Sequence, residues 1–318
     1  MRFFRLAAAA AFIMCCVLSA FCTKKNTGVS ALRLGFLQND LHHLPAFVAL
    51  EKGFFKDEGL EVKVAGVFKA GPEEMSAFGA HELDIGYVGQ APATAAVLNG
   101  VADIKFIAQV NLEGSSIVVG TESACENFAA LAGKTVAMPG HATMQDFLLR
   151  KALAKNNIKI NEVQTIVLKP PEMLQALNLK NIDAFIAWEP YPSQAVKSNA
   201  GRIILSSGEI LENHPCCVLI ASASLCAKSP ETIKKIQSVH RRACDYIASN
   251  RNEAVAIGSK YTGMDNKTIS LAVTRIKYRS ELDRQKGAEF VDFLKELQYV
   301  KAKNLDKKAN DLYEHAGN

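Results

Sequence analysis

Two stretches of the sequence decide its fold: ELDIGYV at residues 82–88 and NIDAFIA at residues 181–187. In each, an Asp opens an apolar run that follows a short amphipathic helix pattern and leads into a turn, at residues 89–92 and 188–191. A short apolar run between turn signals is typical of a buried strand. Because the unit occurs twice, the sequence predicts two similar α/β lobes. Ligands of such sheets bind outside the carboxyl ends of the strands, so we expect a cleft between the lobes at these turns.

The alternation of strand and helix extends outward from both stretches. Helices are predicted from Pro45 to Glu58 and from about Thr143 to Lys155, and the chain beyond Pro230 is predicted to be helical to its end. Strands that alternate with helices favour parallel sheets. We therefore expect an α/β fold in which each lobe is a mostly parallel sheet flanked by helices. The predicted strands are residues 31–37, 60–64, 83–88, 104–110, 134–138, 163–168, 182–187, 202–205 and 218–222.

Length and composition are those of a globular protein of two domains. The chain has 318 residues, against roughly 150 for one typical domain. Lys and Arg number 37 and Asp and Glu 32, which gives a net charge of +5. The basic residues cluster only in pairs, so a nucleic-acid partner is not expected.

Residues 1–22 form a predicted targeting segment. Arg2 and Arg5 precede an uncharged run that ends in small residues and Cys22, as in a secretory signal. The segment resembles a bacterial lipoprotein signal, which implies lipidation of Cys22, although Phe21 stands where a small residue is usual. Cleavage without lipidation and an uncleaved anchor are the alternatives. All three place the folded part outside the cytoplasm, on the periplasmic side of the cell membrane.

The cysteines do not form an evident framework. The sequence has eight Cys, and six remain once Cys15 and Cys16 are removed with the signal. With Cys22 lipidated the remainder is odd, which argues against a set of disulfides. The spacing gives no zinc pattern, so no metal or cofactor is expected. For the adjacent Cys216 and Cys217, a strained disulfide, a soft metal contact and buried thiols are all open, with buried thiols the default.

Catalytic motifs are absent from the sequence. It contains no G-x-S-x-G, H-E-x-x-H, P-loop or G-x-G-x-x-G pattern. A triad of Ser115, His141 and Asp146 can be imagined, but such a set can be picked from almost any chain, and a triad is recognised by geometry. We therefore expect a binding protein rather than an enzyme.

The candidate ligand-binding residues follow predicted strands. Thr143 and Asp146 have the spacing of a capping box, and a helix N-terminus at this place is a potential anion site. The single Trp, Trp188, could cover a ligand at the mouth of the cleft. Each also has a plainer interpretation, as an ordinary cap and as a core residue. The full set of candidates is Asn39, His43, Gln90, Ala91, Glu113, Ser115, Ser116, His141, Thr143, Met144, Trp188, Glu189, Tyr191 and Cys216.

Taken together, four blocks resemble the substrate-binding proteins of ABC importers for nitrate, taurine, aliphatic sulfonates and thiamine-pyrimidine precursors. The blocks are residues 45–62, 83–92, 133–137 and 183–191. The resemblance implies a two-lobed periplasmic binding-protein fold of type II, with lobes that close on the ligand by hinge motion. It implies a first lobe of 29–119 plus 218–318 and a second lobe of 120–217. The implied partners are the permease subunits and the ATPase of an ABC importer. A monomer is expected.

The sequence leaves the ligand open. His141-Ala142 stands where sulfonate-binding members usually have Ser or Asn, Gln90 replaces a Glu, and no Arg is evident in the pocket. A sulfonate would then depend on N–H groups, hydroxyls and His141 as a cation.

Two other functions remain open beside sulfonate binding. A pyrimidine would instead use Tyr87, Trp188, Gln90 and His43. An enzyme like the yeast-type thiamine-pyrimidine synthase, which shares this fold and has a Cys-rich stretch comparable to residues 214–217, is disfavoured by the export signal, since that enzyme is cytosolic.

Overall fold

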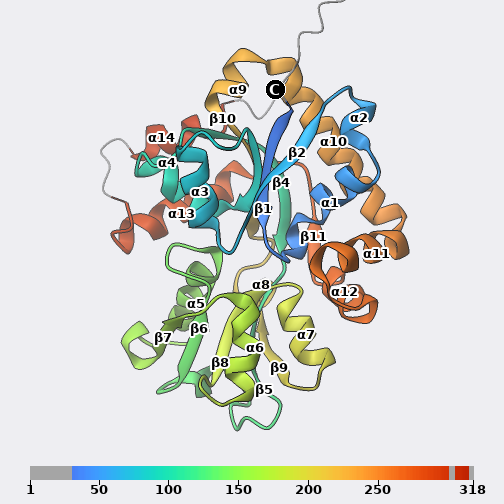
Figure 1. Cartoon of the computed structure of the whole chain (residues 1–318). Helices are drawn as coiled ribbons and strands as arrows, with labels where there is room; N and C mark the ends of the chain where they lie inside the picture. The colour runs from blue at the N-terminus through green and yellow to red at the C-terminus, as the bar shows by residue number, and fades with distance from the viewer. Residues whose placement is uncertain (1–30, 301–304, 315–318) are drawn as a thin grey trace, which may run out of the picture. The chain divides into compact units, whose positions relative to one another are not determined.

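Two β-sheets organise the part of the chain that the computed structural model describes, residues 31–300 and 305–314 (Figure 1). The targeting segment and Cys22 lie outside the described residues. The first sheet has the strand order β11-β4-β10-β3-β1-β2 and the second β7-β6-β8-β5-β9. The first sheet comprises β1 (Leu32–Leu37), β2 (Val62–Phe68), β3 (Ile85–Gly89), β4 (Ile104–Glu113), β10 (Pro215–Ser222) and β11 (Ile276–Tyr278). The second comprises β5 (Ser115–Gly120), β6 (Thr135–Met138), β7 (Gln164–Val167), β8 (Ala184–Trp188) and β9 (Gly201–Ser206).

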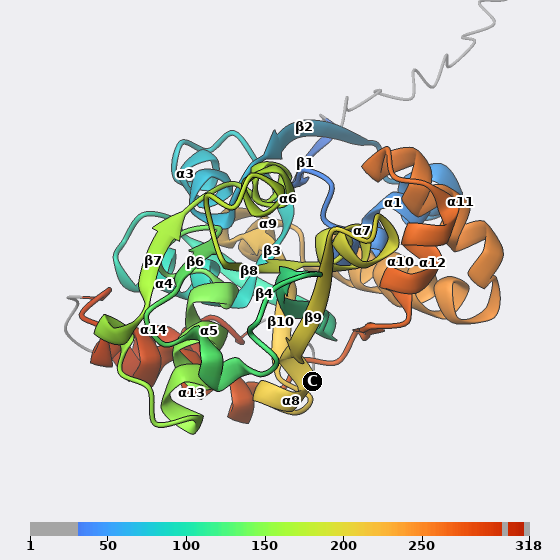
Figure 2. The same cartoon turned by 90° about the horizontal axis from the view of Figure 1, so that it is seen from below.

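Helices cover the faces of both sheets. In the second sheet α6 and α7 lie on one face and α5 and α8 on the other (Figure 2). The helices before β10 are α1 (Leu44–Glu51), α2 (Phe54–Asp57), α3 (Gly71–Gly79), α4 (Gln90–Leu98), α5 (Met144–Lys155), α6 (Pro170–Asn178), α7 (Tyr191–Lys197) and α8 (Ser207–Ile210). Those after it are α9 (Ala223–Lys228), α10 (Pro230–Ser249), α11 (Arg251–Thr262), α12 (Asn266–Val273), α13 (Arg284–Glu296) and α14 (Leu305–Asp311). Short 3₁₀ turns occur at Leu41–His43, Phe128–Leu131 and Ile160–Glu162.

The repeat seen in the sequence is confirmed at the level of hydrogen bonds. Asp84 precedes β3, and its carboxylate accepts the backbone N–H of Arg33 at 2.8 Å. Asp183 precedes β8 and accepts the backbone N–H of Thr135 at 2.8 Å. Each Asp also donates its own N–H to the carbonyl of the same partner, at 2.9 Å in both cases. The two Asp residues therefore pin corresponding pairs of parallel strands in the two sheets.

The sheets are mixed, whereas the sequence pattern led us to expect mostly parallel ones. Parallel pairing holds β1 to β2 and β3, and β6 to β7 and β8. In contrast, β4, β5, β9 and β10 pair antiparallel with their neighbours. The tail after Pro230 is also not wholly helical, because residues 276–278 form β11, the edge strand beside β4. Edge pairing of this kind depends on tertiary contacts that helical periodicity does not report.

The chain crosses between the sheets twice, and strained backbone marks both crossings. On the way out, Glu113 and Gly114 have φ of 59° and 91°; on the way back, Asn213 has φ of 53°. Glu113 joins the crossings, since its carboxylate accepts the Asn213 N–H at 2.8 Å and pairs with Lys277 at 2.8 Å. These crossings lie a few residues before the predicted lobe boundaries at 119/120 and 217/218. That division into lobes stays a prediction.

Gly114 cannot be replaced without cost. A Cβ at Gly114 would lie 2.4 Å from His42 Nε2, and its φ of 91° is one that side chains rarely adopt. We expect Gly114→Ala to lower the free energy of unfolding by about 1–3 kcal/mol, measured by urea denaturation. The matched control is Gly120→Ala in β5, where nothing lies within 4 Å of the added methyl. The control should stay within about 0.5 kcal/mol of wild type; equal losses in both variants would contradict the explanation.

The Arg33–Asp84 contact predicts a pH dependence of stability. Burial alone would raise the Asp84 pKa, but the hydrogen bonds from Arg33 outweigh it and hold the pKa below its ordinary value. The ionised carboxylate therefore stabilises the native state above the ordinary pKa of about 4, and this stabilisation is lost as the pH falls through the lowered folded-state pKa. Wild type should exceed Asp84→Asn in unfolding free energy at pH 6, by a margin that shrinks towards pH 3. A margin independent of pH would contradict this.

Candidate functional site

A small cavity lies where strand ends of the two sheets meet. Its volume is about 20 Å³, roughly enough for one water molecule and too small for a solute of several atoms. Both halves of the chain contribute to it, and every side chain that lines it is buried. The lining residues are Leu37, Asp40, His42, Gly71, Gly89, Pro92, Thr143, Met144, Gln145, Trp188, Cys216 and Cys217.

The start of α5 forms the wall from the second sheet. Thr143 caps this helix: its hydroxyl accepts the Asp146 N–H at 3.3 Å and donates to the Gly140 carbonyl at 2.7 Å. The side-chain N–H of Gln145 donates to Ser115 Oγ at 3.0 Å. The positive end of the helix dipole thus faces the cavity, which favours an anion there.

Trp188, at the end of β8, carries a donor without an acceptor. Its side chain is 3% exposed, and its indole Nε1 has no hydrogen-bond partner among the described residues. A buried N–H left unpaired costs free energy, so such a group on a cavity wall indicates an acceptor supplied by a ligand or by water.

The wall from the first sheet is dense in titratable groups. Burial raises the pKa of Asp40 to about 7. Burial lowers the pKa of His42, but the neighbouring Cys216 thiolate and Asp40 carboxylate outweigh it and raise the pKa to about 10. A hydrogen bond from the Cys217 thiol, followed by the charge of His42, holds the pKa of Cys216 well below its ordinary value. His42 Nδ1 lies 3.5 Å from Cys216 Sγ, so an imidazolium and a thiolate here would stabilise each other.

Four of the residues predicted from the sequence line the cavity: Thr143, Met144, Trp188 and Cys216. Three others are engaged elsewhere. Gln90 donates to the Tyr313 hydroxyl at 2.8 Å, and the exposed His141 lies 3.2 Å from the Tyr299 hydroxyl. Glu113 belongs to the crossing described above.

The remaining predicted residues lie behind the lining or beside it. Glu189 is fully buried, which raises its pKa to about 7, and it accepts the Ser193 N–H at 3.1 Å. Tyr191 packs edge-on against Trp188 with ring centroids 6.3 Å apart. His43 accepts the Leu37 N–H at 3.2 Å. The other four, which also do not line the cavity, are the half-buried Asn39 and the buried Ala91, Ser115 and Ser116.

The imagined triad does not form. Ser115 Oγ accepts from Gln145 rather than from an imidazole. His141 and Asp146 both contact the Tyr299 hydroxyl, and Asp146 also pairs with Arg150 at 2.7 Å. No Ser–His–Asp relay connects these three side chains.

Three of the four titratable residues on the first-sheet wall, Asp40, His42 and Cys217, were not predicted from the sequence. Asp40 and His42 were not among the candidates, although they follow β1 at its carboxyl end, the same signal that selected Trp188 and Thr143. For Cys217 the sequence leaves a disulfide, a soft metal contact and a buried thiol open, with the buried thiol as the default. Gln145 lies within the helix start whose Thr143 and Met144 were chosen.

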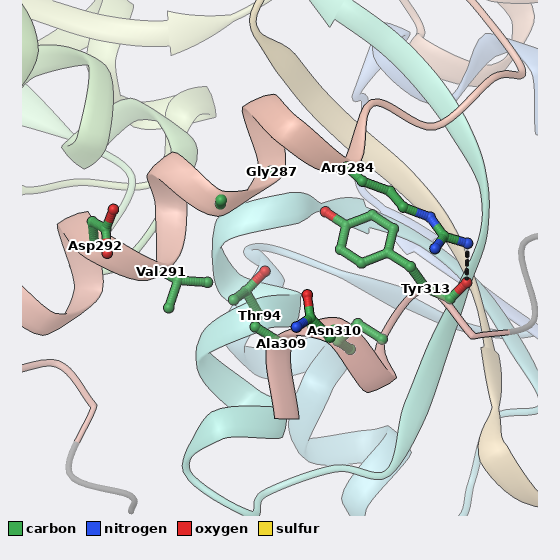
Figure 3. Close-up of a pocket in the computed structure, with 10 residues that line it drawn as sticks. Thr94, Arg284, Gly287, Val291, Asp292, Ala309, Asn310 and Tyr313 are labelled. Carbon is green, nitrogen blue, oxygen red and sulfur yellow. Dashed lines mark hydrogen bonds between the residues drawn. The ribbon is translucent and has the colours of Figure 1, made fainter. Parts of the chain in front are cut away.

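A second, larger pocket lies between α4, α13 and α14 (Figure 3). Its volume is about 280 Å³. Arg284 lies at one end of it beside Tyr313 and donates to the backbone carbonyl of that residue at 2.8 Å, so this cation is already engaged. The pocket is formed by helices and receives no strand ends, so the smaller cavity is the better candidate for a ligand site.

The two sheets share one strand arrangement, β2-β1-β3-β10-β4 in the first and β7-β6-β8-β5-β9 in the second. Two crossings of the chain join them, and a cavity lies where their strand ends meet. These features are those of a two-lobed binding protein. Residues 25–259 match the NMT1-like family, and the chain belongs to it. It is 29% identical over 241 residues to a provisionally named binding protein of Brucella abortus, covering 75% of this chain and 73% of that protein. It is 25% identical over 257 residues to a provisionally named aliphatic sulfonates-binding protein of Escherichia coli, covering 79% and 78%.

Solved structures share the fold. The alkanesulfonate-binding protein SsuA of Xanthomonas axonopodis, with MOPS bound, has a TM-score of 0.77 at 18% identity and covers 88% of this chain and 97% of its own. The nitrate-binding protein NrtA of Synechocystis has a TM-score of 0.78 at 19% identity and covers 90% and 86%. The periplasmic binding-protein fold and the family resemblance predicted from the sequence are confirmed. Among the described residues, no helix has the length and apolar character needed to cross a membrane.

The cap of α5 offers a direct test of this wall. Thr143→Ala removes the hydroxyl that accepts the Asp146 N–H, and we expect a loss of about 1 kcal/mol in unfolding free energy. Thr143→Ser keeps the hydroxyl and should stay near wild type, both measured by urea denaturation. Equal stability of the Ala and Ser variants would show that the cap contributes nothing.

Proposed function

We propose that this protein is an extracytoplasmic solute-binding protein that captures a small organic anion, of the aliphatic sulfonate or taurine type, and delivers it to an ABC importer. The observation that carries the anion assignment is the unpaired, buried indole N–H of Trp188 on the same cavity as the first turn of α5. Both are neutral donors that suit the oxygens of a sulfonate. The names of the relatives, which include sulfonate- and nitrate-binding proteins, support the same class.

The size of the cavity supports capture by movement of the lobes. A volume of about 20 Å³ cannot admit a sulfonate, so the two walls must separate for it to enter. The two crossings, at Gly114 and Asn213, supply the residues about which such a hinge would turn. We assign the first lobe to 29–119 plus 218–318 and the second to 120–217, as the sequence predicted.

Delivery would follow from the place and the partners of the protein. We infer that the signal segment exports the chain, that Cys22 is lipidated and anchors it, and that the protein acts as a monomer. It would dock on the permease subunits of an importer driven by a separate ATPase. The names of its relatives are those of binding proteins, which supports a carrier over an enzyme.

A heterocycle such as a pyrimidine is the second candidate. One observation favours it: within the described part of the chain, no Lys or Arg lines the cavity. Of the four residues expected to hold a pyrimidine, however, only Trp188 lines it. Gln90, His43 and Tyr87 do not. The anion is therefore the better-supported ligand.

A thermal-shift panel tests the assignment. The protein is stripped of ligand by partial unfolding and refolding, then mixed with taurine, ethanesulfonate, nitrate, hydroxymethylpyrimidine or thiamine. A ligand at 100 times its Kd adds about 2.7 kcal/mol of stability, which a melting curve resolves. We expect sulfonates to raise the melting temperature. A shift with heterocycles alone would contradict the anion assignment.

Two variants locate the response. Trp188→Phe removes the donor and should weaken sulfonate binding roughly tenfold, the equivalent of one hydrogen bond. His141→Gln, outside the cavity, is the control and should bind as wild type does. If His141→Gln lost the sulfonate shift and Trp188→Phe kept it, the anion would not bind at this cavity.

A further inference from the structure

Three side chains on the first-sheet wall bring metal-ligand atoms together. His42 Nδ1 lies 3.5 Å from Cys216 Sγ and 3.5 Å from Cys217 Sγ. The two sulfurs are 3.9 Å apart. All three residues are at most 3% exposed, and they come from the turn after β1 and from β10, 174 residues away along the chain.

A local irregularity of β10 turns both thiols to the same side. Consecutive residues of a regular strand point to opposite faces. The register of β10 against β4 shifts on both sides of Cys217: Pro215 pairs with Leu112, Cys217 with Asn111 and Val218 with Gln109. The Cys217 N–H donates to Asn111 Oδ1 at 3.2 Å. A bulge re-aims side chains in this way and is common beside functional sites.

A hydrogen bond from its second ring nitrogen fixes the orientation of the His42 ring. Its Nε2 donates to the Gly114 carbonyl at 2.8 Å, so the Nδ1 atom faces the sulfurs. Gly114 permits this approach because it has no Cβ, which would otherwise collide with the ring. Metal-binding histidines are usually held by such a bond from the second ring nitrogen to a carbonyl.

The distances match a metal site. With metal–sulfur bonds of about 2.3 Å and metal–nitrogen bonds of about 2.05 Å, a tetrahedral zinc site separates two sulfurs by about 3.8 Å and sulfur from nitrogen by about 3.6 Å. The observed 3.9 and 3.5 Å are within about 0.1 Å of these values. The two sulfurs are far from the separation of about 2.05 Å that a disulfide requires.

We propose that His42 Nδ1, Cys216 Sγ and Cys217 Sγ bind one thiophilic divalent cation of the Zn²⁺ class. Two thiolates balance the charge of the ion, which suits a buried site. Asp40 is the nearest candidate for the fourth position, since its carboxylate lies within 4.8 Å of the Cys217 and His43 ligand atoms. When the ion binds, the thiol protons and any proton on Nδ1 leave to solvent, and no oxidation is involved.

This inference goes beyond the proposed function and does not depend on it. The three proposed ligand atoms all come from this chain, and the metal is measured in the absence of an organic solute. The sulfonate shift is measured on metal-free protein, so that either proposal can fail alone. In the sequence no zinc spacing is evident and a soft metal contact of the Cys pair stays open, because His42 lies far from that pair along the chain.

Cobalt titration of the full chain tests the site. The protein is treated with a phosphine reductant and a chelator, and then titrated with Co²⁺ and afterwards with Zn²⁺. We expect one equivalent of Co²⁺ with thiolate charge-transfer absorption, displaced by Zn²⁺. Cys216→Ser and Cys217→Ser should each weaken binding more than roughly a hundredfold, beyond the usual loss from removing a supporting contact. Cys226→Ser changes a buried thiol of α9 and should bind as wild type does.

A measurement on wild type keeps the proposal open to refutation if a variant fails to fold. X-ray absorption of the zinc-loaded protein should show two sulfurs at about 2.3 Å and nitrogen at about 2.05 Å. A shell of nitrogen and oxygen alone would overturn the proposal. So would the absence of Co²⁺ binding by the reduced protein, or an equal loss of affinity in Cys226→Ser.

Discussion

The carbonyl oxygen of Gly114 is the point on which the rest of the site depends. It lies on the crossing between β4 and β5 and accepts the His42 ring N–H at 2.8 Å and the Glu189 backbone N–H at 2.9 Å. The Leu41 N–H, in turn, donates to the Glu189 carbonyl at 3.1 Å. One carbonyl thus ties the turn after β1 in the first sheet to the end of β8 in the second. The missing Cβ of Gly114 and its left-handed φ are the conditions for this contact.

The hydrogen bonds to the Gly114 carbonyl determine which groups face the cavity. On one side they turn Nδ1 of His42 to the two sulfurs, and on the other they fix the backbone beside Trp188. The two walls then differ in chemistry. The wall from the first sheet presents the imidazole nitrogen of His42 and the two sulfurs of β10. The wall from the second sheet presents neutral N–H donors of α5 and β8. Because two thiolates would neutralise a dication, an ion at the first wall adds little net charge. An anionic solute would therefore depend on the dipole of α5 and on Trp188 rather than on the ion.

The repeated fold could be predicted from the sequence because its signals are local. The Asp before β3 and the Asp before β8 each stand beside an apolar run. Position at a predicted strand end selected Trp188, and the same position together with a capping-box spacing selected Thr143. Gln90 and His141 occupy the same kind of position, yet they bond to Tyr313 and Tyr299, which arrive from the C-terminal tail. The pairing of His42 with Cys217 depends on a bulge in β10, and no periodicity in the sequence reports a bulge. The parts of the site that could not be predicted therefore depend on contacts between residues far apart in the sequence.

The C-terminal helices limit how the lobes can separate. The Phe147 ring of α5 packs edge-on against Phe290 and Phe293 of α13, at 4.8 and 4.9 Å between centroids. The Tyr299 hydroxyl donates to Asp146 of α5 at 3.0 Å. Helix α13 also packs on α4 beside the first sheet. A rotation of α5 away from α13 would expose these rings to water, which opposes that movement. Because α13 contacts both α5 and α4, the proposed hinge motion would either carry α13 along with α5 or slide the two helices past each other.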